Sequence, residues 1–251
     1  MASDGPGSAS VPGVGASPAG ADRVSRDMLI CLENLIDEAT VTRLRSWMAE
    51  ATFEDGKATA GGNAAMVKHN QQVSSDPDHP DPKLEEMKHL IRDLLWDHEL
   101  FCGAAQPQRI HPPLFSRYTT GMGYGTHMDN ALMGNSRVDM SLSIFLSNPS
   151  DYDGGELVLE LPFGERAIKL PAGSGVLYST TALHRVTEVT RGERLAAVTW
   201  VRSYIRDPAR REMLFDLRAA HHRLADQLGK TPEVDLLSKI HTNLLRHWVE
   251  D

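Results

Sequence analysis

The segment from Leu114 to Tyr204 constrains the fold of this chain more than any other part. Its hydrophobic residues follow the two-residue period of β-strands, and turn-forming residues such as Gly121, Asn135 and Gly164 interrupt it. The predicted strands are residues 114–119, 124–129, 138–147, 155–161, 165–170, 174–179, 183–189 and 193–204. About eight short strands with little helix between them are typical of an antiparallel barrel or a jelly roll.

Helical patterns flank the β-rich segment on both sides. Asp37, Asp81–Pro82, Asp207–Pro208 and Thr231–Pro232 are predicted helix starts, because a capping side chain or a first-turn proline favours that position. Apolar residues recur at helical spacing after each start, which predicts packing against the rest of the protein; for the last two helices a partner-binding role is the alternative. The predicted stripes are Val41, Leu44, Trp47 and Met48; Met87, Leu90, Ile91 and Leu94; Leu214, Leu217, Leu224 and Leu228; and Leu237, Ile240, Leu244 and Trp248. We therefore predict a mainly β fold, a jelly-roll barrel (double-stranded β-helix) with N-terminal and C-terminal helices.

The 251 residues divide into three predicted regions. Residues 1–25 are rich in Ala, Gly, Ser and Pro, and we expect a disordered tail because they cannot bury enough apolar surface. Residues 26–206 form the predicted domain, with N-terminal helices and the jelly-roll core, and residues 207–251 a helical extension packed on the barrel. Residues 53–82 lack a sustained period, which predicts a long loop, either a mobile lid over the barrel mouth or a disordered insert.

Composition excludes several classes of protein. The net charge of -8 disfavours a nucleic-acid partner, because phosphate contacts need a basic surface. Cys31 and Cys102 are isolated, which predicts neither a disulfide framework nor a thiolate zinc site and favours a reducing compartment, the cytoplasm. No apolar run approaches the ~18 residues of a membrane span, so no membrane partner is expected. Homo-oligomerisation stays open.

The stretch from Tyr124 to Asn130 carries candidate metal ligands. His127 and Asp129 are two residues apart, and on an extended strand such residues point to the same face. Two histidines and one carboxylate on one face of an octahedron form the facial triad of non-haem Fe(II) oxygenases, so a third ligand is needed. A second pair, His79 and Asp81, lies in the loop-like segment, where Pro80 separates its members. We predict that this second pair is on the surface, with Asp81 as an N-cap.

His184, near the start of a predicted strand, is the candidate third ligand. Arg194 follows across the predicted turn at Arg191–Gly192. If the two strands form a hairpin, Arg194 lies opposite Val189, roughly 16 Å along the strand from His184 at ~3.3 Å per residue. A metal-bound dicarboxylate and two side chains can cover that separation, and the guanidinium fork binds a carboxylate bidentately. The alternative is a salt bridge at the barrel rim with Glu188 or Glu193.

Ser141 and Ser143 allow two interpretations. On the strand that contains them, small side chains facing the barrel interior would leave room for a co-substrate. The alternative is that these serines form the solvent-facing half of an outer sheet, since antiparallel sheets often alternate in this way.

Five ordered motifs resemble those of the PKHD-type hydroxylases. This family consists of bacterial relatives of the prolyl 4-hydroxylase catalytic domain, in the 2-oxoglutarate/Fe(II) dioxygenase superfamily. The resemblance runs from about Met28 to Phe215. Its motifs are Phe115-Ser116-Arg117-Tyr118, His127-x-Asp129-Asn130, Asp153-Gly154-Gly155-Glu156-Leu157, Leu183-His184-Arg185-Val186 and Thr190-Arg191-Gly192-x-Arg194.

The resemblance implies a catalytic set of His127, Asp129, His184 and Arg194. The first three are implied iron ligands, and Arg194 is the implied partner of the distal carboxylate of 2-oxoglutarate, with Tyr118 as a second contact. The implied reaction hydroxylates a C–H bond of an unidentified substrate, a prolyl or lysyl residue of a peptide or a small molecule, and releases succinate and CO2. Members of the family are also commonly described as binding L-ascorbate, which re-reduces iron.

The chain also departs from the family pattern. Leu195 and Ala196 follow Arg194, so the Arg-x-Ser pair that helps hold the co-substrate in some relatives is absent. Tyr118 or Thr199 would have to supply that hydroxyl. Two other functions compete with the hydroxylase. A non-catalytic, cupin-like metal or ligand sensor would need the metal site but no anchor for a dicarboxylate. A nucleic-acid demethylase would draw on a small basic cluster, although the net charge disfavours it; this cluster is Arg202, Arg206, Arg210 and Arg211.

Overall fold

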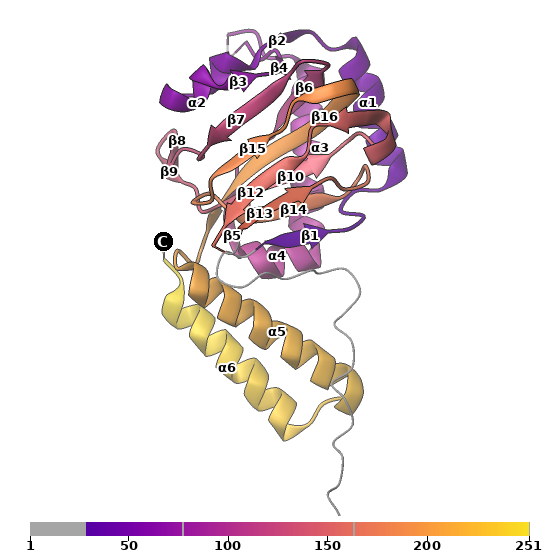
Figure 1. The fold of residues 1–251 in the computed structure, drawn as a ribbon. Coiled ribbons are helices and arrows are strands. Elements are labelled where there is room, and N and C mark those ends of the chain that lie inside the picture. Colours follow the sequence, from indigo (N-terminus) through magenta and orange to yellow (C-terminus); the bar gives the residue numbers. More distant parts are fainter. Residues whose placement is uncertain (1–28, 77, 163, 251) are drawn as a thin grey trace, which may run out of the picture.

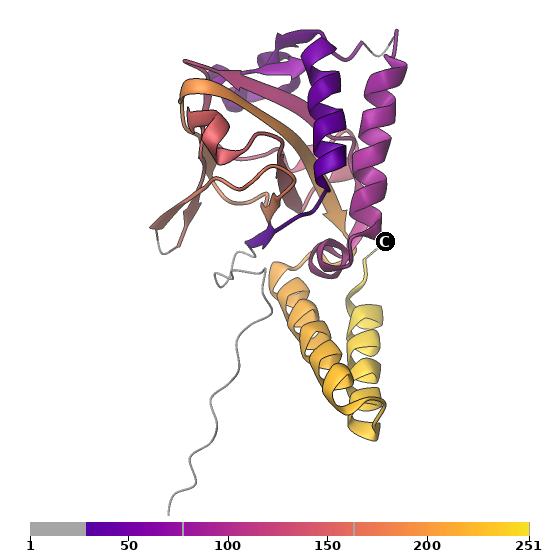
Figure 2. The ribbon, with the colours of Figure 1, turned by 90° about the vertical axis from the view of Figure 1, so that its right-hand side faces the viewer.

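A computed structural model describes residues 29–76, 78–162 and 164–250 of the chain. Two antiparallel sheets face each other, and helices cover the outer side of the larger one (Figures 1 and 2). This arrangement is a jelly roll with flanking helices, which confirms the predicted fold class. The predicted disordered tail, residues 1–25, lies outside the described residues.

The larger sheet supplies one wall of the barrel. Its strands follow the order β1 (Ile30–Leu32), β14 (Gly175–Ser179), β10 (Met140–Phe145), β16 (Val189–Ser203), β6 (Leu114–Thr119), β4 (Gln71–Val73) and β2 (Phe53–Asp55). The long strand β16 also pairs with β5 (Pro107–Ile110) and β11 (Tyr152–Gly154). Every strand predicted between residues 114 and 204 overlaps an observed one, whereas β5 was not predicted.

The smaller sheet forms the opposite wall. Its order is β13 (Gly164–Ile168), β12 (Leu157–Leu161), β15 (His184–Val186), β7 (Gly123–His127) and β3 (Lys68–His69). A short ladder joins β8 (Leu132–Met133) to β9 (Ser136–Arg137) beside the barrel, and the 3₁₀ turn η2 (Pro149–Asp151) precedes β11. Apolar side chains between the two sheets, among them Phe145, Leu159 and Val176, form one of two hydrophobic cores.

Helices α1 (Glu38–Glu50) and α3 (Pro82–Asp97) cover the outer face of the larger sheet (Figure 2). Asp37 and Asp81 cap them as predicted, accepting hydrogen bonds from the backbone N–H groups of Thr40 and Lys83 at 2.7 and 2.8 Å. The predicted stripe of α1 is fully buried, and in α3 Leu84, Met87, Ile91 and Leu95 are buried while Leu90 and Leu94 are half-buried. These side chains form the second core with the sheet, next to the unpredicted helix α4 (Glu99–Ala105).

The last two helices form a hairpin that projects from one end of the barrel (Figures 1 and 2). Asp207 and Thr231 cap α5 (Pro208–Leu228) and α6 (Pro232–Trp248), as predicted. Leu214 is buried, but Leu228 and Ile240 are 57% and 40% exposed. The prediction that both stripes pack as a core is therefore wrong at Leu228 and Ile240, which no other part of the described chain covers. The predicted boundaries 26–206 and 207–251 remain a prediction.

The segment 53–82 is more ordered than its sequence predicts. It contains β2, the 3₁₀ helix η1 (Gly56–Thr59), α2 (Gly62–Met66), β3 and β4 before a loop leads into α3. The prediction of a long structureless loop is wrong for residues 53–73, because these short strands are defined by distant partners: β4 pairs with β6 and β3 with β7. The segment joins both sheets at one edge of the barrel, and its role as a mobile lid stays a prediction.

The predicted hairpin between 183–189 and 193–199 is also wrong. β15 belongs to the smaller sheet and β16 to the larger one, so the chain crosses from one wall to the other between them. Gly192, with φ of +77°, does not make a hairpin turn; it lies within β16, where an added Cβ would clash with the Asp151 carbonyl oxygen. Arg194 consequently pairs with Tyr118 rather than with Val189.

None of the helices in the described parts of the chain combines the length and the apolar character needed to cross a bilayer.

Candidate active site

Three predicted metal ligands converge where β7 ends and β15 begins in the smaller sheet. His127 ends β7, Asp129 follows two residues later, and His184 begins β15 directly opposite His127 in the strand pairing. One ligand atom from each lies within 4.8 Å of the other two, and within the described residues no other group of three or more His, Cys, Asp or Glu side chains meets in this way. Two imidazoles and one carboxylate suit Fe(II) and leave coordination positions open.

Backbone carbonyls orient both histidines toward a common point. Nδ1 of His127 lies 2.9 Å from the Gly125 carbonyl oxygen, and Nδ1 of His184 lies 3.0 Å from that of Ala182. With its proton on Nδ1, each ring donates to its carbonyl and leaves the Nε2 lone pair for a metal. In both cases the carbonyl belongs to the residue two positions earlier, so the backbone immediately before each histidine sets the orientation of the ring.

Ser141 orients the carboxylate of the triad. It lies on β10 in the opposite wall, and its hydroxyl donates to Oδ2 of Asp129 at 2.5 Å. Ser141 and Ser143 are 0% and 4% exposed, so the interpretation that they face solvent is wrong. Ser143 lines the cavity, in agreement with the interpretation that small residues leave room there, and the contact from Ser141 to Asp129 was not predicted.

The environment keeps His127 in the form that binds a metal. Its side chain is buried, and the Tyr124 ring stacks on it with a centroid distance of 3.6 Å. Burial, together with neighbouring His184, lowers the pKa of His127 to about 4. The imidazole is therefore neutral near pH 7, as a metal ligand must be.

Arg194 lies in the same cavity as the triad and is 2% exposed. Its guanidinium carbon is 5.0 Å from the ring centroid of Tyr118 and 5.4 Å from that of Phe145. No carboxylate in the described residues lies within ion-pair distance, and Nε has no hydrogen-bond partner there. The predicted alternative of a rim salt bridge is wrong, because Arg194 is buried and Glu193 instead faces Arg117 at 3.9 Å.

The alternation along β16 separates the two candidate hydroxyls. Arg194, Val198 and Trp200 line the cavity, whereas Thr199 points to the opposite side of the sheet and donates to the His111 carbonyl oxygen at 2.5 Å. Tyr118 does line the cavity, and burial raises the pKa of its hydroxyl. A protonated tyrosine beside Arg194 can donate a hydrogen bond to a bound carboxylate.

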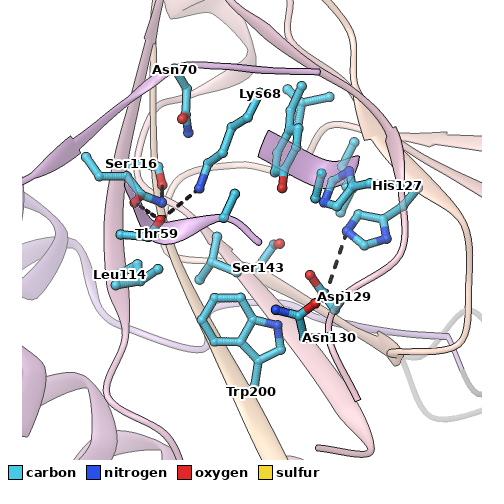
Figure 3. A pocket seen from close by; sticks show the side chains of 18 of the residues that line it. Thr59, Lys68, Asn70, Leu114, Ser116, His127, Asp129, Asn130, Ser143 and Trp200 are labelled. Carbon is cyan, nitrogen blue, oxygen red and sulfur yellow. Dashed lines mark hydrogen bonds and ion pairs between the residues drawn. The ribbon is translucent and has the colours of Figure 1, made fainter. Parts of the chain in front are cut away.

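A polar wall that the sequence analysis missed faces the cavity from the segment between residues 68 and 72 (Figure 3). Lys68, Asn70 and Gln72 are buried, and they occupy alternate positions of one extended segment. The sequence gives no periodic signal there, because residues 68–72 (Lys-His-Asn-Gln-Gln) are all polar. Which of these side chains face the cavity follows only from the pairing of β3 with β7 and of β4 with β6.

Two other groups of residues lie away from the site. His79 is exposed and contacts Asp76, and Asp81 caps α3, so the second His-x-Asp pair is on the surface as predicted. Arg211 is 2% exposed and donates to the carbonyl oxygens of Ile205 and Arg206. One of the four arginines of the basic cluster is therefore buried and cannot contact a nucleic acid, which weakens the nucleic-acid alternative.

Comparisons with known proteins agree with this geometry. The model of the 2OG-Fe(II) oxygenase superfamily matches residues 113–202, the segment that contains the triad and Arg194. An oxidoreductase of the 2OG-Fe(II) oxygenase family from Burkholderia pseudomallei shares the fold, with a TM-score of 0.51 at 19% identity over 68% of this chain and 82% of that one. Fold and site thus define a 2-oxoglutarate- and Fe(II)-dependent oxygenase.

The family within this class follows from closer relatives. A PKHD-type hydroxylase of Synechococcus elongatus is 47% identical over 227 residues, 89% of this chain and the whole of the relative. Another, from Maricaulis maris, is 45% identical over 224 residues with the same coverage. The model of the PKHD-type hydroxylase C-terminal domain matches residues 208–250, the hairpin of α5 and α6. The chain belongs to the PKHD-type hydroxylase family and is an Fe(II)/2-oxoglutarate-dependent hydroxylase.

Proposed function

We propose that His127, Asp129 and His184 hold the iron and that Arg194 binds the distal carboxylate of 2-oxoglutarate, with the Tyr118 hydroxyl as a second contact. The observation that carries this proposal is the buried guanidinium of Arg194, which has no carboxylate partner among the described residues and shares a cavity with the triad. A buried cation without a counter-ion is costly, and a bound dicarboxylate would relieve that cost.

Each residue has a defined task in this proposal. The two neutral imidazoles and the carboxylate anchor the metal, and Ser141 fixes the direction of the Asp129 carboxylate. Arg194 and Tyr118 fix the far end of the co-substrate, so that its keto-acid end reaches the metal. Bound iron and 2-oxoglutarate supply the oxidation, in which O2, 2-oxoglutarate and a substrate C–H bond give succinate, CO2 and a C–OH group. The protein contributes orientation and a cavity shielded from water.

Several finer points belong to the same proposal. The hydroxylated group is a prolyl or lysyl residue of a peptide or a carbon of a small molecule. L-Ascorbate restores Fe(II) after turnovers that do not hydroxylate a substrate. Because neither Cys31 nor Cys102 takes part in a disulfide, a reducing compartment such as the cytoplasm suits the protein. The alternative of a non-catalytic metal or ligand sensor gives Arg194 no task, since a sensor needs no anchor for a dicarboxylate.

Turnover of 2-oxoglutarate tests the proposal. Wild-type protein with Fe(II), O2 and ascorbate should convert 2-oxoglutarate to succinate, and peptide or metabolite pools that contain the substrate should raise the rate. Asp129→Ala and His184→Ala should abolish conversion. His79→Ala is the matched control, since this exposed histidine belongs to the other His-x-Asp pair. Conversion at the wild-type rate by His184→Ala would contradict the assignment of the triad, and binding of Fe(II) without binding of 2-oxoglutarate would favour the sensor.

A further inference from the structure

The polar wall described above contains a second buried cation. Lys68 is 5% exposed and faces the cavity that contains the triad (Figure 3). Its ammonium group donates to the Thr59 hydroxyl at 3.0 Å and lies 5.3 Å from the Tyr124 ring centroid. No carboxylate in the described residues lies within ion-pair distance of it. Burial lowers the pKa of Lys68 to about 8, so the ammonium form still predominates at neutral pH.

Asn70 presents an unpaired amide beside this cation. Its side chain is 3% exposed, and neither Nδ2 nor Oδ1 has a hydrogen-bond partner in the described residues. The Tyr118 hydroxyl is close enough for Asn70 to oppose the rise in its pKa, but the two groups form no hydrogen bond of normal geometry. Gly56 makes room for this amide, because a Cβ at that position would clash with Asn70 Oδ1. A buried amide without partners is costly unless a ligand supplies them.

The rest of the wall is already satisfied and therefore rigid. Thr59 donates to the Gln72 side-chain oxygen while it accepts from Lys68, and the Gln72 amide donates to the Ser116 hydroxyl at 3.4 Å. These contacts tie η1, β4 and β6 together behind the cavity. Lys68 and Asn70 are left as the donors of this wall that can still bind a ligand.

The charges of the site with Fe(II) and 2-oxoglutarate bound indicate the sign of the charge on such a ligand. The charges of Fe(II) and the 2-oxoglutarate dianion cancel, and so do those of Asp129 and Arg194. Lys68 is then the remaining buried charge, because both histidines are neutral as metal ligands. A single negative charge would neutralise the closed site, and low-dielectric surroundings strengthen such a pair.

We propose that Lys68 and Asn70 form an anion subsite that holds a carboxylate of the substrate to be hydroxylated. The ammonium and the amide N–H would each donate to this carboxylate, and the Thr59 network would hold the ammonium in place. The substrate class is therefore a carboxylate-bearing molecule, such as an amino acid derivative with a free carboxyl group. The inference rests on the proposed function, since it assumes that Arg194 and the iron bind the co-substrate.

Matched pools of charged and neutral compounds test this subsite. The probes are N-acetyl amino acids with a free carboxylate and the same compounds as carboxamides, equilibrated without oxygen against protein carrying Fe(II), with and without 2-oxoglutarate. Wild-type protein should retain at least one carboxylate about tenfold better than its amide, a difference of about 1.4 kcal/mol. Lys68→Met should lose this preference and keep its affinity for 2-oxoglutarate. Asn70→Ala is a second variant that leaves the charge in place, and it should weaken the preference in part.

Lys57→Met is the matched control, because Lys57 lies on η1 next to the site but its side chain is exposed. This variant should keep both the preference and the affinity for 2-oxoglutarate. Equal retention of amides, or retention of no carboxylate by the wild-type protein, would overturn the proposal. A loss of 2-oxoglutarate affinity in Lys68→Met would assign Lys68 to the co-substrate instead. Failure of the wild-type protein to bind 2-oxoglutarate would contradict the proposed function, which separates the two failures.

Discussion

Replacement of Arg194 by Met should change ligand binding and stability in opposite directions. Arg194→Met removes one partner of a buried charge pair in the 2-oxoglutarate complex, a loss of about 2–5 kcal/mol. At about 1.4 kcal/mol per factor of ten, affinity for 2-oxoglutarate falls by about 30-fold to 4,000-fold. Without ligand the guanidinium has no carboxylate partner among the described residues and lies against Tyr118 and Phe145. A methionine of similar length removes that buried charge, so the free energy of unfolding should be unchanged or rise by up to about 1–4 kcal/mol.

Thermal unfolding with and without 2-oxoglutarate measures both effects on the same samples. Under anaerobic conditions with Fe(II), a ligand at 100 times its dissociation constant stabilises the wild-type protein by about 2.7 kcal/mol. Arg194→Met should lose this increment, and Arg194→Lys should recover part of it, because a point charge cannot reproduce the bidentate fork. Arg191→Met is the matched control, since the Arg191 side chain is 59% exposed and pairs with Asp153 on the surface. Lower stability of ligand-free Arg194→Met together with an unchanged 2-oxoglutarate increment would refute the reasoning and make Arg194 a structural residue.

Three further predictions concern metal binding, the orientation of the Asp129 carboxylate and the hydrophobic core. Alanine at any triad position should abolish tight Fe(II) binding while His79→Ala and Asp81→Ala retain it; metal analysis of the purified variants decides this for His127, Asp129 and His184. Ser141→Ala removes the 2.5 Å hydrogen bond to the triad carboxylate and should weaken metal affinity by about 10–100-fold in a chelator competition, where unchanged affinity would argue against an orienting role. In urea unfolding, Ile91→Ala should cost about 2–5 kcal/mol, whereas Leu236→Ala, at a position 53% exposed, should stay within about 0.5 kcal/mol. An equal loss of unfolding free energy in the two variants would mean that the Leu236 side chain of α6 is packed in a core.

The sequence predicts the barrel well where apolar residues alternate over a whole strand. The strand predicted at 114–119 coincides with β6, and that at 174–179 with β14 but for one residue. Capping residues such as Asp37 and Asp81 act over two or three residues, so their effect can also be predicted from the local sequence. The ligand pair His127 and Asp129 could also be found locally from its spacing, although β7 ends at His127 and Asp129 lies just beyond the strand.

Predictions fail where a feature depends on a distant partner. The Arg191–Gly192 pair was interpreted as a turn, but Gly192 is needed because β11 passes close to its backbone. That approach cannot be foreseen from neighbouring residues. β3 and β4 have two and three residues, too few for a period to show, and pairing with β7 and β6 defines them. The polar wall was missed for this reason, and the Ser141 contact because it links two sheets.

The two-faced character of β16 has a consequence for how enzymes of this kind acquire new substrates. Arg194, Val198 and Trp200 line the cavity, while the residues between them, including Leu195 and Ala197, belong to the core beneath the helices. A one-residue slip would exchange the two faces, so a change that disturbs the helix layer also threatens the binding of the co-substrate. Lys68 lies instead on β3, the edge strand of the smaller sheet, and Asn70 lies in the link between β3 and β4. If Lys68 and Asn70 hold the substrate as proposed, selection can vary substrate preference there while the co-substrate site on β16 stays constant.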